Sequence, residues 1–565
     1  MTRFPRRRSI VPLVLAGFAL VSLGGSASAD VTAVTPLAPQ VTVQGPPATP
    51  PPATPKPATP PSTPPRPAPA PDVKAYTDAN RITDPDKKIE AMRTFLEEFP
   101  DSSRKSSAHR AIFDTLVKER PDRREQILQH AQSVIDATPE QVRASAYGRV
   151  ATALVDANVM LEEAEKFATE GLEVFDREEK KRVQRSRATH LATLGRIRIK
   201  QGRIAEAESA LEDAFAANPE IPSAAIGLAE LAENKGDDRT ALDYWMKGSL
   251  TGRLSADDRQ RFEGLYRKVN GSLDTLESTL DAKYKAAYPP PVHPEPYKAS
   301  PARTHRMVLA EVFTGAACPP CVSVDLGFDA VLERYARKDV AVLMYHAHIP
   351  GPDPLTSKWT DDRRNWYKVT GVPNFAVDGV LDNRGGGGRD ATKAAFDRIV
   401  SKLDKALEVA PDAELALTAT LEGNVVRVKA MPSKLEAEGK PVKLQIALVE
   451  ELLSYSGANG IRFHPMVVRN LAQSGEGGFT VERAKPAAAE YTFDLAKITA
   501  DLKAYLDDYE VNGRHGKITF SQKPVQMDTS RLSVVAFLQE DDSRKVLQSA
   551  YVKLGSGTST SAAVR

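Results

Sequence analysis

Cys318 and Cys321 are the only cysteines among 565 residues, and they lie three positions apart in the stretch FTGAACPPCVSVDLGF. A disulfide between them would close a loop of four residues, which stabilises a chain by only about 2 kcal/mol on a chain-entropy estimate. That gain is small for so long a chain, so chemistry explains the pair better than cross-linking does. Two such sulfurs support thiol–disulfide exchange, in which one thiolate attacks a disulfide and the second sulfur releases the product.

The N-terminal sequence predicts export. A basic start is followed by an apolar run from Ile10 to Leu23 and by small residues up to Ala29. These features are typical of a signal peptide, predicted over residues 1–29, and no later segment approaches the length of an integral membrane segment. We therefore expect a periplasmic or secreted protein, in a compartment where a dithiol can be oxidised.

Composition bears on the class of partner and on which segments are disordered. Charged residues make up 27% of the chain, with a formal net charge of +2, which gives no indication of a nucleic-acid partner. Residues 30–72 are proline-rich and predict a disordered, extended linker. Residues 557–565 predict a disordered tail.

Residues 73–288 predict helices that repeat. In the later half of this range residue types recur at an offset of 34 positions, as in Gly202 and Gly236 or Ala207 and Ala241. Small residues at these positions let the two helices of a hairpin approach closely. The pattern resembles tetratricopeptide repeats, which implies an all-α solenoid whose concave face binds a peptide or a partner protein.

Alternating strands and helices are predicted around the cysteines, over residues 297–409. HRMVLAEVF predicts a strand buried on both faces, and Cys318 follows it at the start of a helix whose first turn accommodates Pro319. A second buried strand, DVAVLMYHAH, then a helix, a strand within GVPNFAVDGVLDN and a closing helix complete the order. The glycine run RGGGGRD lacks the lysine and the hydroxyl of a nucleotide-binding loop, so it predicts a flexible connection.

This order, with Cys-Pro-Pro-Cys opening the first helix and Val372-Pro373 opening a later strand, resembles the thioredoxin-like family. The segments EVFTGAACPPC and GVPNFAVDG are similar to secreted bacterial members of that family. The resemblance implies an α/β thioredoxin-like domain and a thiol–disulfide oxidoreductase that needs no cofactor and acts on protein thiols or disulfides. It also implies Cys318, Cys321 and Pro373 as site residues, with Pro373 cis and lying against a redox-active disulfide.

The start of the helix gives the two cysteines different predicted roles. A helix N-terminus favours negative charge, so we expect a lowered pKa for the Cys318 thiol, while Cys321 is placed to resolve a mixed disulfide. Ala317 stands where the family has an aromatic residue, and Val312 stands where it often has a buried acid. Glu311 is adjacent, but strand alternation turns its side chain to the other face. Proton transfer to and from Cys321 is therefore expected to be handled differently.

His346 and His348, in YHAHIPGPDP, suggest a second hypothesis. They follow a strand predicted to end on the same side of the sheet as Cys318, and two cysteines with two histidines could ligate zinc or copper. Against this, both histidines would have to reach across to the cysteines. A copper- or zinc-handling thioredoxin-like protein and a redox-silent periplasmic scaffold are the alternatives to redox catalysis.

Residues 410–556 alternate like a half-buried sheet. Several short strands and one helix, AKITADLKAYLDDYE, predict a β-rich, β-sandwich-like domain with no chemistry of its own. GIRFHPMVVRNL is expected to be a loop or an edge segment, with His464 a packed residue. The whole chain is thus predicted to be multidomain, with a proline-rich stalk, a tetratricopeptide solenoid, a thioredoxin-like domain and a terminal β-domain.

Overall fold

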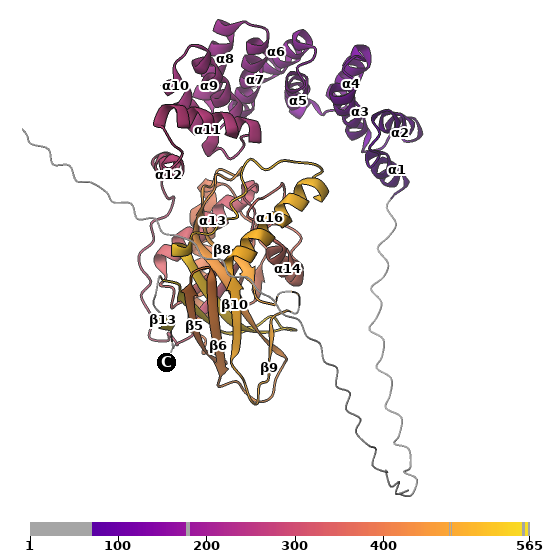
Figure 1. Ribbon diagram of the computed structural model, residues 1–565. Helices are drawn as coiled ribbons and strands as arrows, with labels where there is room; N and C mark the ends of the chain where they lie inside the picture. Colours follow the sequence, from indigo (N-terminus) through magenta and orange to yellow (C-terminus); the bar gives the residue numbers. More distant parts are fainter. Residues whose placement is uncertain (1–69, 177–180, 474, 476, 556–559, 563–565) are drawn as a thin grey trace, which may run out of the picture. The chain divides into compact units, whose positions relative to one another are not determined.

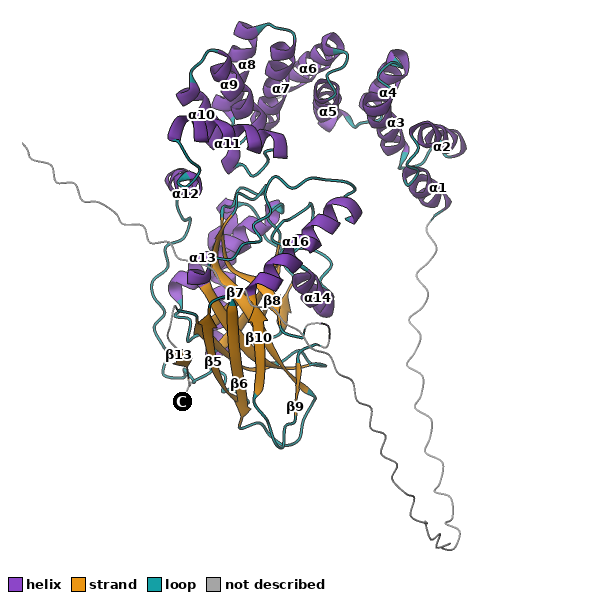
Figure 2. Cartoon of the chain, viewed as in Figure 1, coloured by secondary structure: helices purple, strands orange, loops and turns teal. Residues whose placement is uncertain are grey.

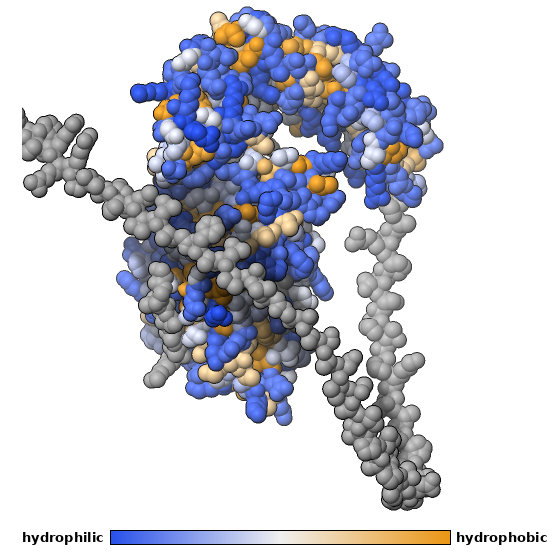
Figure 3. Space-filling view, in the orientation of Figure 1, coloured by the Kyte–Doolittle hydropathy of each residue, from blue (hydrophilic) through white to orange (hydrophobic). Residues whose placement is uncertain are grey.

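The computed structural model describes residues 70–176, 181–473, 475, 477–555 and 560–562 (Figure 1). The predicted signal peptide at 1–29 and nearly all of the predicted linker at 30–72 lie outside these residues. In the described part of the chain, no helix combines the length and the apolar character needed to cross a membrane. On the face seen in Figure 3 hydrophilic residues predominate, and apolar residues form small separate areas.

Twelve α-helices, with no strand between them, make up the first part of the described chain (Figure 2). They are α1 Pro71–Asn80, α2 Pro85–Glu98, α3 Lys105–Glu119, α4 Arg124–Asp136, α5 Arg143–Asp156, α6 Leu161–Asp176, α7 Lys181–Lys200, α8 Ile204–Ala217, α9 Pro222–Asn234, α10 Asp238–Leu250, α11 Ala256–Asn270 and α12 Leu276–Ala287. Most of these helices bury one face against their neighbours, as in a stack of hairpins.

The two helical hairpins α7–α8 and α9–α10 repeat with the predicted period. Gly202 and Gly236, in their turns, both have a φ of +75°, a left-handed conformation that favours glycine. The following helices begin at Ile204 and Asp238, again 34 positions apart. The structure therefore confirms a tetratricopeptide-like helical repeat in this part of the chain.

The rest of the described chain contains two β-sheets. The strands are β1 Val308–Thr314, β2 Val340–His346, β3 Asn374–Val377, β4 Val380–Asp382, β5 Glu414–Glu422, β6 Val425–Ser433, β7 Val442–Ser454, β8 Phe463–Leu471, β9 Phe479–Val481, β10 Ala489–Asp494, β11 Leu532–Glu540, β12 Val546–Lys553 and β13 Thr560–Ala562. The helices are α13 Val322–Arg334, α14 Lys358–Tyr367, α15 Thr392–Leu407 and α16 Leu495–Asn512.

The larger sheet is mixed, with the strand order β12-β11-β7-β8-β2-β1-β3-β4 and with β9 paired to β7. Strands β1 and β2 run parallel and β3 is antiparallel to β1. Every residue of β1 and β2 is buried, as predicted for strands covered on both faces. The predicted order of strands and helices around the cysteines is present, from β1 through α13, β2, α14, β3 and β4 to α15.

The boundary expected at residue 410 does not interrupt the larger sheet. Strands β7, β8, β11 and β12 come from the predicted β-domain, yet they belong to the same sheet as β1 and β2, because β8 lies parallel to β2. The smaller sheet, β10-β6-β5-β13, shares an apolar core with β7, β11 and β12. The two sheets thus pack in a sandwich-like manner, but one of them is shared with the region around the cysteines.

Two sequence predictions are wrong in this region. The segment GIRFHPMVVRNL is not a loop or an edge, because most of it forms β8 between β7 and β2. Its polar side chains hid the strand pattern, and they are paired inside the protein: Arg469 with Glu450, for example, at 3.4 Å. Within the predicted tail at 557–565, residues 560–562 form β13, which pairs with the edge strand β5 and so satisfies backbone groups of that edge.

A buried ion pair connects the two halves of the larger sheet. The guanidinium of Arg363 on α14 donates to both carboxylate oxygens of Glu311 on β1, at 2.7 and 2.9 Å, and to Gln539 on β11 at 2.6 Å. The hydroxyls of Tyr345 and Tyr367 also donate to Glu311, at 3.0 and 2.6 Å. As strand alternation predicts, Glu311 points to the α14 side, so it serves the packing of the sheet.

Replacing Arg363 should destabilise the protein. Arg363→Met leaves Glu311 buried without its cation, so we expect the free energy of unfolding to fall by about 3–5 kcal/mol. The double variant Glu311→Gln, Arg363→Met should recover part of that loss because no charge is then left unpaired. Denaturant unfolding measures both changes; a loss below about 1 kcal/mol in the single variant would contradict the role of this pair.

Candidate active site

Cys318 and Cys321 form a disulfide between the end of β1 and the start of α13. Cys318 is extended and precedes a 3-10 turn, Pro319–Cys321, whose first position is a proline, and α13 begins only at Val322. The sequence predicted that the helix begins at Cys318, whereas this short turn separates the two. Both sulfur-bearing residues are buried, with exposed fractions of 1% for Cys318 and 0% for Cys321. The covering segments described below explain this burial.

Pro373 lies in a cis peptide bond with Val372, as the family resemblance implies. The Sγ atom of Cys318 is 3.8 Å from the carbonyl oxygen of Val372. The backbone beside the disulfide is therefore that of Val372, and its carbonyl oxygen faces the sulfur of Cys318.

The glycine run 385–388 closes one side of the site. A Cβ on Gly386 would come within 2.1 Å of the carbonyl oxygen of Pro320 and 2.9 Å of Pro373, so only glycine fits there. Gly387 donates its N–H to the hydroxyl of Ser323 at 2.7 Å and accepts the N–H of Ser323 at 3.0 Å. This segment packs tightly against the residues around the disulfide, whereas the sequence predicted only a flexible connection.

The peptide groups at Ala316 hold the segment before the disulfide from both sides. The N–H of Ala316 donates to Asp353 at 2.6 Å, and its carbonyl accepts the N–H of Asn459 at 2.9 Å. The side-chain amide of Asn459 also donates to the carbonyl of Gly315 at 3.3 Å. Asn459 belongs to the β7–β8 loop (residues 455–462), so a segment far along the chain helps to cover the cysteines.

The β7–β8 loop is itself bound by the last helices of the array. Arg462 forms ion pairs with Glu277 and Asp281 of α12 at 2.6 and 2.7 Å. The hydroxyl of Tyr284, also on α12, donates to the carbonyl of Gly460 at 3.1 Å. Sequence reasoning missed this loop because its contacts join residues almost two hundred positions apart, such as Glu277 and Arg462.

Asp325 is a buried acid on α13, one helical turn after Cys321. One of its oxygens accepts the hydroxyl of Thr314 at 2.8 Å, whereas its Oδ1 atom has no hydrogen-bond partner. Burial raises the pKa of Asp325 to about 7, although the bond from Thr314 acts in the opposite direction. Its position four residues after Cys321 on a predicted helix is the signal that could have identified it.

His346 and Asp353 form a second buried pair at the end of β2. The Nδ1 atom of His346 is 2.8 Å from Asp353, whose carboxylate also accepts the N–H groups of Ala316 and Leu355. Burial opposes ionisation of Asp353, but the charge and hydrogen bond of His346 and the two N–H groups outweigh it and lower the pKa. The Nε2 atom of His346 is buried and has no hydrogen-bond partner.

His348 and His464 lie beside this pair, and the ring of His464 contacts the ring of His346, with 5.1 Å between centroids. His348 accepts the N–H of Asp353 at 2.9 Å and stacks on Tyr509, and burial lowers its pKa to about 4. His464 is buried, as expected, with Nε2 at 2.9 Å from the carbonyl of Tyr455, and burial lowers its pKa to about 3. Within the described residues, no three His, Cys, Asp or Glu side chains are grouped so that they could hold a metal.

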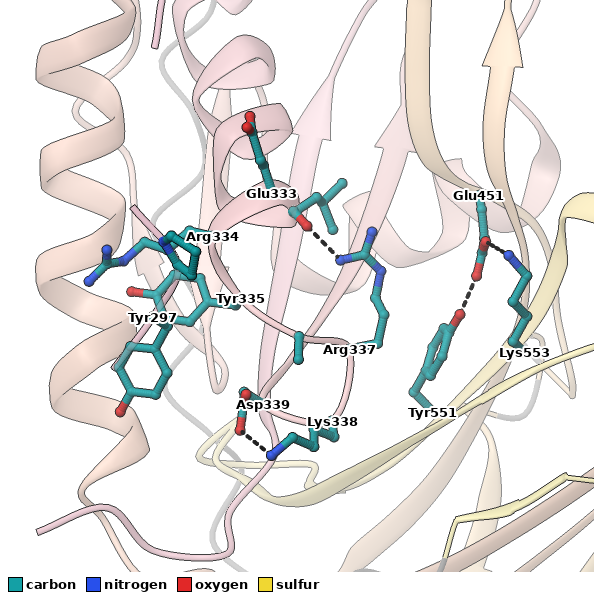
Figure 4. Close-up of a pocket in the computed structure, with 13 residues that line it drawn as sticks. Tyr297, Glu333, Arg334, Tyr335, Arg337, Lys338, Asp339, Glu451, Tyr551 and Lys553 are labelled. Atoms are coloured by element: carbon teal, nitrogen blue, oxygen red, sulfur yellow. Dashed lines mark hydrogen bonds and ion pairs between the residues drawn. The ribbon is translucent and has the colours of Figure 1, made fainter. Parts of the chain in front are cut away.

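A hollow of about 690 Å³ lies at the opposite end of β2 from His346 (Figure 4). Its charged groups are largely paired with one another: Glu451 accepts from Tyr551 and Lys553, and Lys338 lies 3.9 Å from Asp339. Asp339 immediately precedes β2, whereas the disulfide lies beyond the other end of the neighbouring strand β1. This hollow is therefore separate from the cysteine chemistry.

Comparisons with known proteins leave the chain unassigned. No protein-family model and no curated protein matches it. Among solved structures, HBP35 of Porphyromonas gingivalis is 15% identical over 46% of this chain and 79% of its own, with a TM-score of 0.32. PilW, a type IV pilus biogenesis factor, is 17% identical over 39% and 92%, with a TM-score of 0.27. A thermophilic TPR protein of Thermus thermophilus is 18% identical over 34% and 96%, with a TM-score of 0.24. TM-scores this low assign neither fold nor function.

Asp325→Asn should stabilise the oxidised protein at high pH. The pKa of Asp325 is raised from 3.8 to about 7 by folding, so the folded state binds this proton more tightly and wild-type stability falls as pH rises between those values. The variant escapes that loss, and above about pH 7 we expect it to be about 1–4 kcal/mol more stable than the wild type, with no difference near pH 4. Denaturant unfolding at the two pH values measures this; an equal difference at both would contradict the buried, protonated carboxyl.

Proposed function

We propose that this protein is an exported thiol–disulfide oxidoreductase with a thioredoxin-like fold, acting on protein disulfides or dithiols through Cys318 and Cys321. The observation that carries the proposal is the placement of the disulfide. It lies in the short segment that connects the buried parallel strand β1 to helix α13, with the carbonyl before a cis proline 3.8 Å from Cys318 Sγ. Export is inferred from the N-terminal sequence alone.

The two sulfurs take different parts in this reaction. In the reducing direction, the thiolate of Cys318, favoured by its place at the start of the 3-10 turn that leads into α13, attacks a substrate disulfide and forms a mixed disulfide. Cys321 then attacks the Cys318 sulfur, re-forms the Cys318–Cys321 disulfide and releases the substrate thiol. Pro373 lacks an N–H, so its backbone cannot donate a hydrogen bond to the sulfur of Cys318. The carbonyl oxygen of Val372 lies beside that sulfur.

The surroundings of the disulfide favour a protein substrate over a small molecule. Pro319 and Pro320 are exposed beside the buried cysteines. An extended chain laid over the two prolines would bring a disulfide to Cys318 without needing a deep cavity. Attack by Cys318 then requires a local movement of the covering segments, since only 1% of Cys318 is exposed.

The helical array is proposed to bind the partner. A hollow of about 410 Å³ between α5 and α7 is lined by polar and charged side chains, among them Arg149, Asp156 and His190. Such a groove in a stack of helical hairpins suits an extended polar peptide. This part of the proposal is independent of the cysteine chemistry.

The two cysteines should behave differently when replaced. Cys321→Ser removes the resolving sulfur, so Cys318 should accumulate stable mixed disulfides with substrate proteins. Cys318→Ser, the matched control, should trap none because Cys321 is buried behind it. Non-reducing electrophoresis and mass spectrometry of the captured proteins measure both. Equal trapping by the two variants would overturn the assignment of roles, and trapping by neither would overturn the proposed function.

A further inference from the structure

The buried side chains of Asp325, His346 and Asp353 follow one another in space, beginning near Cys321. Thr314 and His346 are register partners on the parallel strands β1 and β2, so their side chains point to the same face of the sheet. The hydroxyl of Thr314 donates to Asp325 at 2.8 Å, which places Asp325 of α13 over that face. The carboxylate of Asp353 lies 2.8 Å from the Nδ1 atom of His346.

One atom on Asp325 and one on His346 have no hydrogen-bond partner. Asp325 Oδ1 and His346 Nε2 are both buried and both lack a hydrogen bond among the described residues. Buried polar atoms are nearly always paired, so two unpaired ones on neighbouring side chains indicate a function that uses them. Both His346 and Asp353 lie close enough to Asp325 to influence its pKa.

Asp325 is also close to the sulfur that must lose a proton. It follows Cys321 by four positions on a helix, and side chains with this spacing lie one above the other, about 5–6 Å apart at Cβ. Both side chains are buried, with exposed fractions of 5% and 0%, so water has little access to either. A buried thiol cannot ionise readily unless a neighbouring group accepts its proton.

We propose that Asp325 accepts the proton of Cys321 and that His346, oriented by Asp353, exchanges this proton with Asp325. The proposal rests on the proposed thiol–disulfide exchange and specifies how its resolving step is carried out. It places the acid on the helix after the cysteines, and not on the preceding strand, where Val312 leaves the site without one.

The step is balanced. Cys321 Sγ–H transfers its proton to Asp325 Oδ1, and the sulfur attacks the Cys318 sulfur of the mixed disulfide. The Cys318–Cys321 bond forms while the bond from Cys318 to the substrate sulfur breaks, and the bonding electron pair leaves with the substrate thiolate. The substrate is reduced and the dithiol is oxidised, so no other oxidant is needed. The proton moves from Asp325 to His346 Nε2, and the substrate thiolate takes a proton from water.

Asp353 determines which nitrogen of His346 can receive the proton. Its carboxylate accepts the proton of Nδ1 and two backbone N–H groups, which leaves the lone pair of Nε2 free. The pKa of Asp325, raised to about 7 by burial, is suited to accepting and releasing a proton near neutral pH. The titratable groups around it are His346, Asp353 and, one turn further along α13, Asp329.

A two-phase thiol reaction tests the proposal in the full-length reduced protein. With 5,5′-dithiobis(2-nitrobenzoate), attack by Cys318 releases one coloured thiolate, and attack by Cys321 on the resulting mixed disulfide releases the second. In the wild type we expect the second phase to accelerate with pH and level off above about pH 7. In Asp325→Asn, which keeps an acceptor for Thr314, the second phase should be at least about tenfold slower at pH 7 and lose that inflection.

Two sets of variants separate the relay from a structural effect. Asp329→Asn removes a half-buried acid on the same helix whose pKa is also raised by burial, to about 8, and should leave the second phase as in the wild type. His346→Gln and Asp353→Asn should shift the pH at which the second phase levels off, without abolishing it. The first phase should be unchanged in Asp325→Asn.

The results for the two kinetic phases test the proton relay and the proposed function separately. A normal first phase with an unaltered second phase in Asp325→Asn would overturn the relay and leave the proposed function intact. An equal slowing in Asp329→Asn would overturn it as well, because the effect would then not be specific to Asp325. Absence of a first phase in the wild type would overturn the proposed function and the relay with it.

Discussion

The site depends on how the short segment between β1 and the disulfide is held. The peptide of Ala316 donates to Asp353 from the β2 side and accepts from Asn459 in the β7–β8 loop, at 2.6 and 2.9 Å. These bonds fix the backbone immediately before Cys318, and they come from two segments that the sequence alone did not connect. The same carboxylate orients His346, so one buried acid positions both the backbone before the cysteines and the histidine behind them.

The shared sheet makes this arrangement possible. Because β8 lies beside β2, the loop that precedes β8 is brought to the end of β1, where the cysteines are. The loop is bound in turn by α12 through Arg462, which pairs with Glu277 and Asp281. A shift of α12 would therefore be passed to the β7–β8 loop, which covers the disulfide, through these ion pairs. The strand-rich part of the chain behaves as one structural unit around the cysteines.

The sequence predicted most of the elements and the residues of the disulfide, but not the surroundings of the site. Helical and strand periods, the turn glycines and the proline after Cys318 are local signals, and the corresponding elements are present. The missed features all depend on distant contacts. The strand β8 carries His464, Arg469 and other polar residues that look exposed until their buried partners are known. Asp325 was visible only as a polar position on a helix, because its burial depends on the strands beneath it.

The most direct test of the central claim is whether the Cys318–Cys321 disulfide exchanges in the native protein. The oxidised protein is incubated with dithiothreitol without denaturant, alkylated and weighed intact by mass spectrometry, and the reduced form is then reoxidised with glutathione disulfide. Two alkyl groups should be added after reduction and none after reoxidation, while circular dichroism should show that the fold is retained. A disulfide that gains no alkyl group until the protein is unfolded would contradict the account.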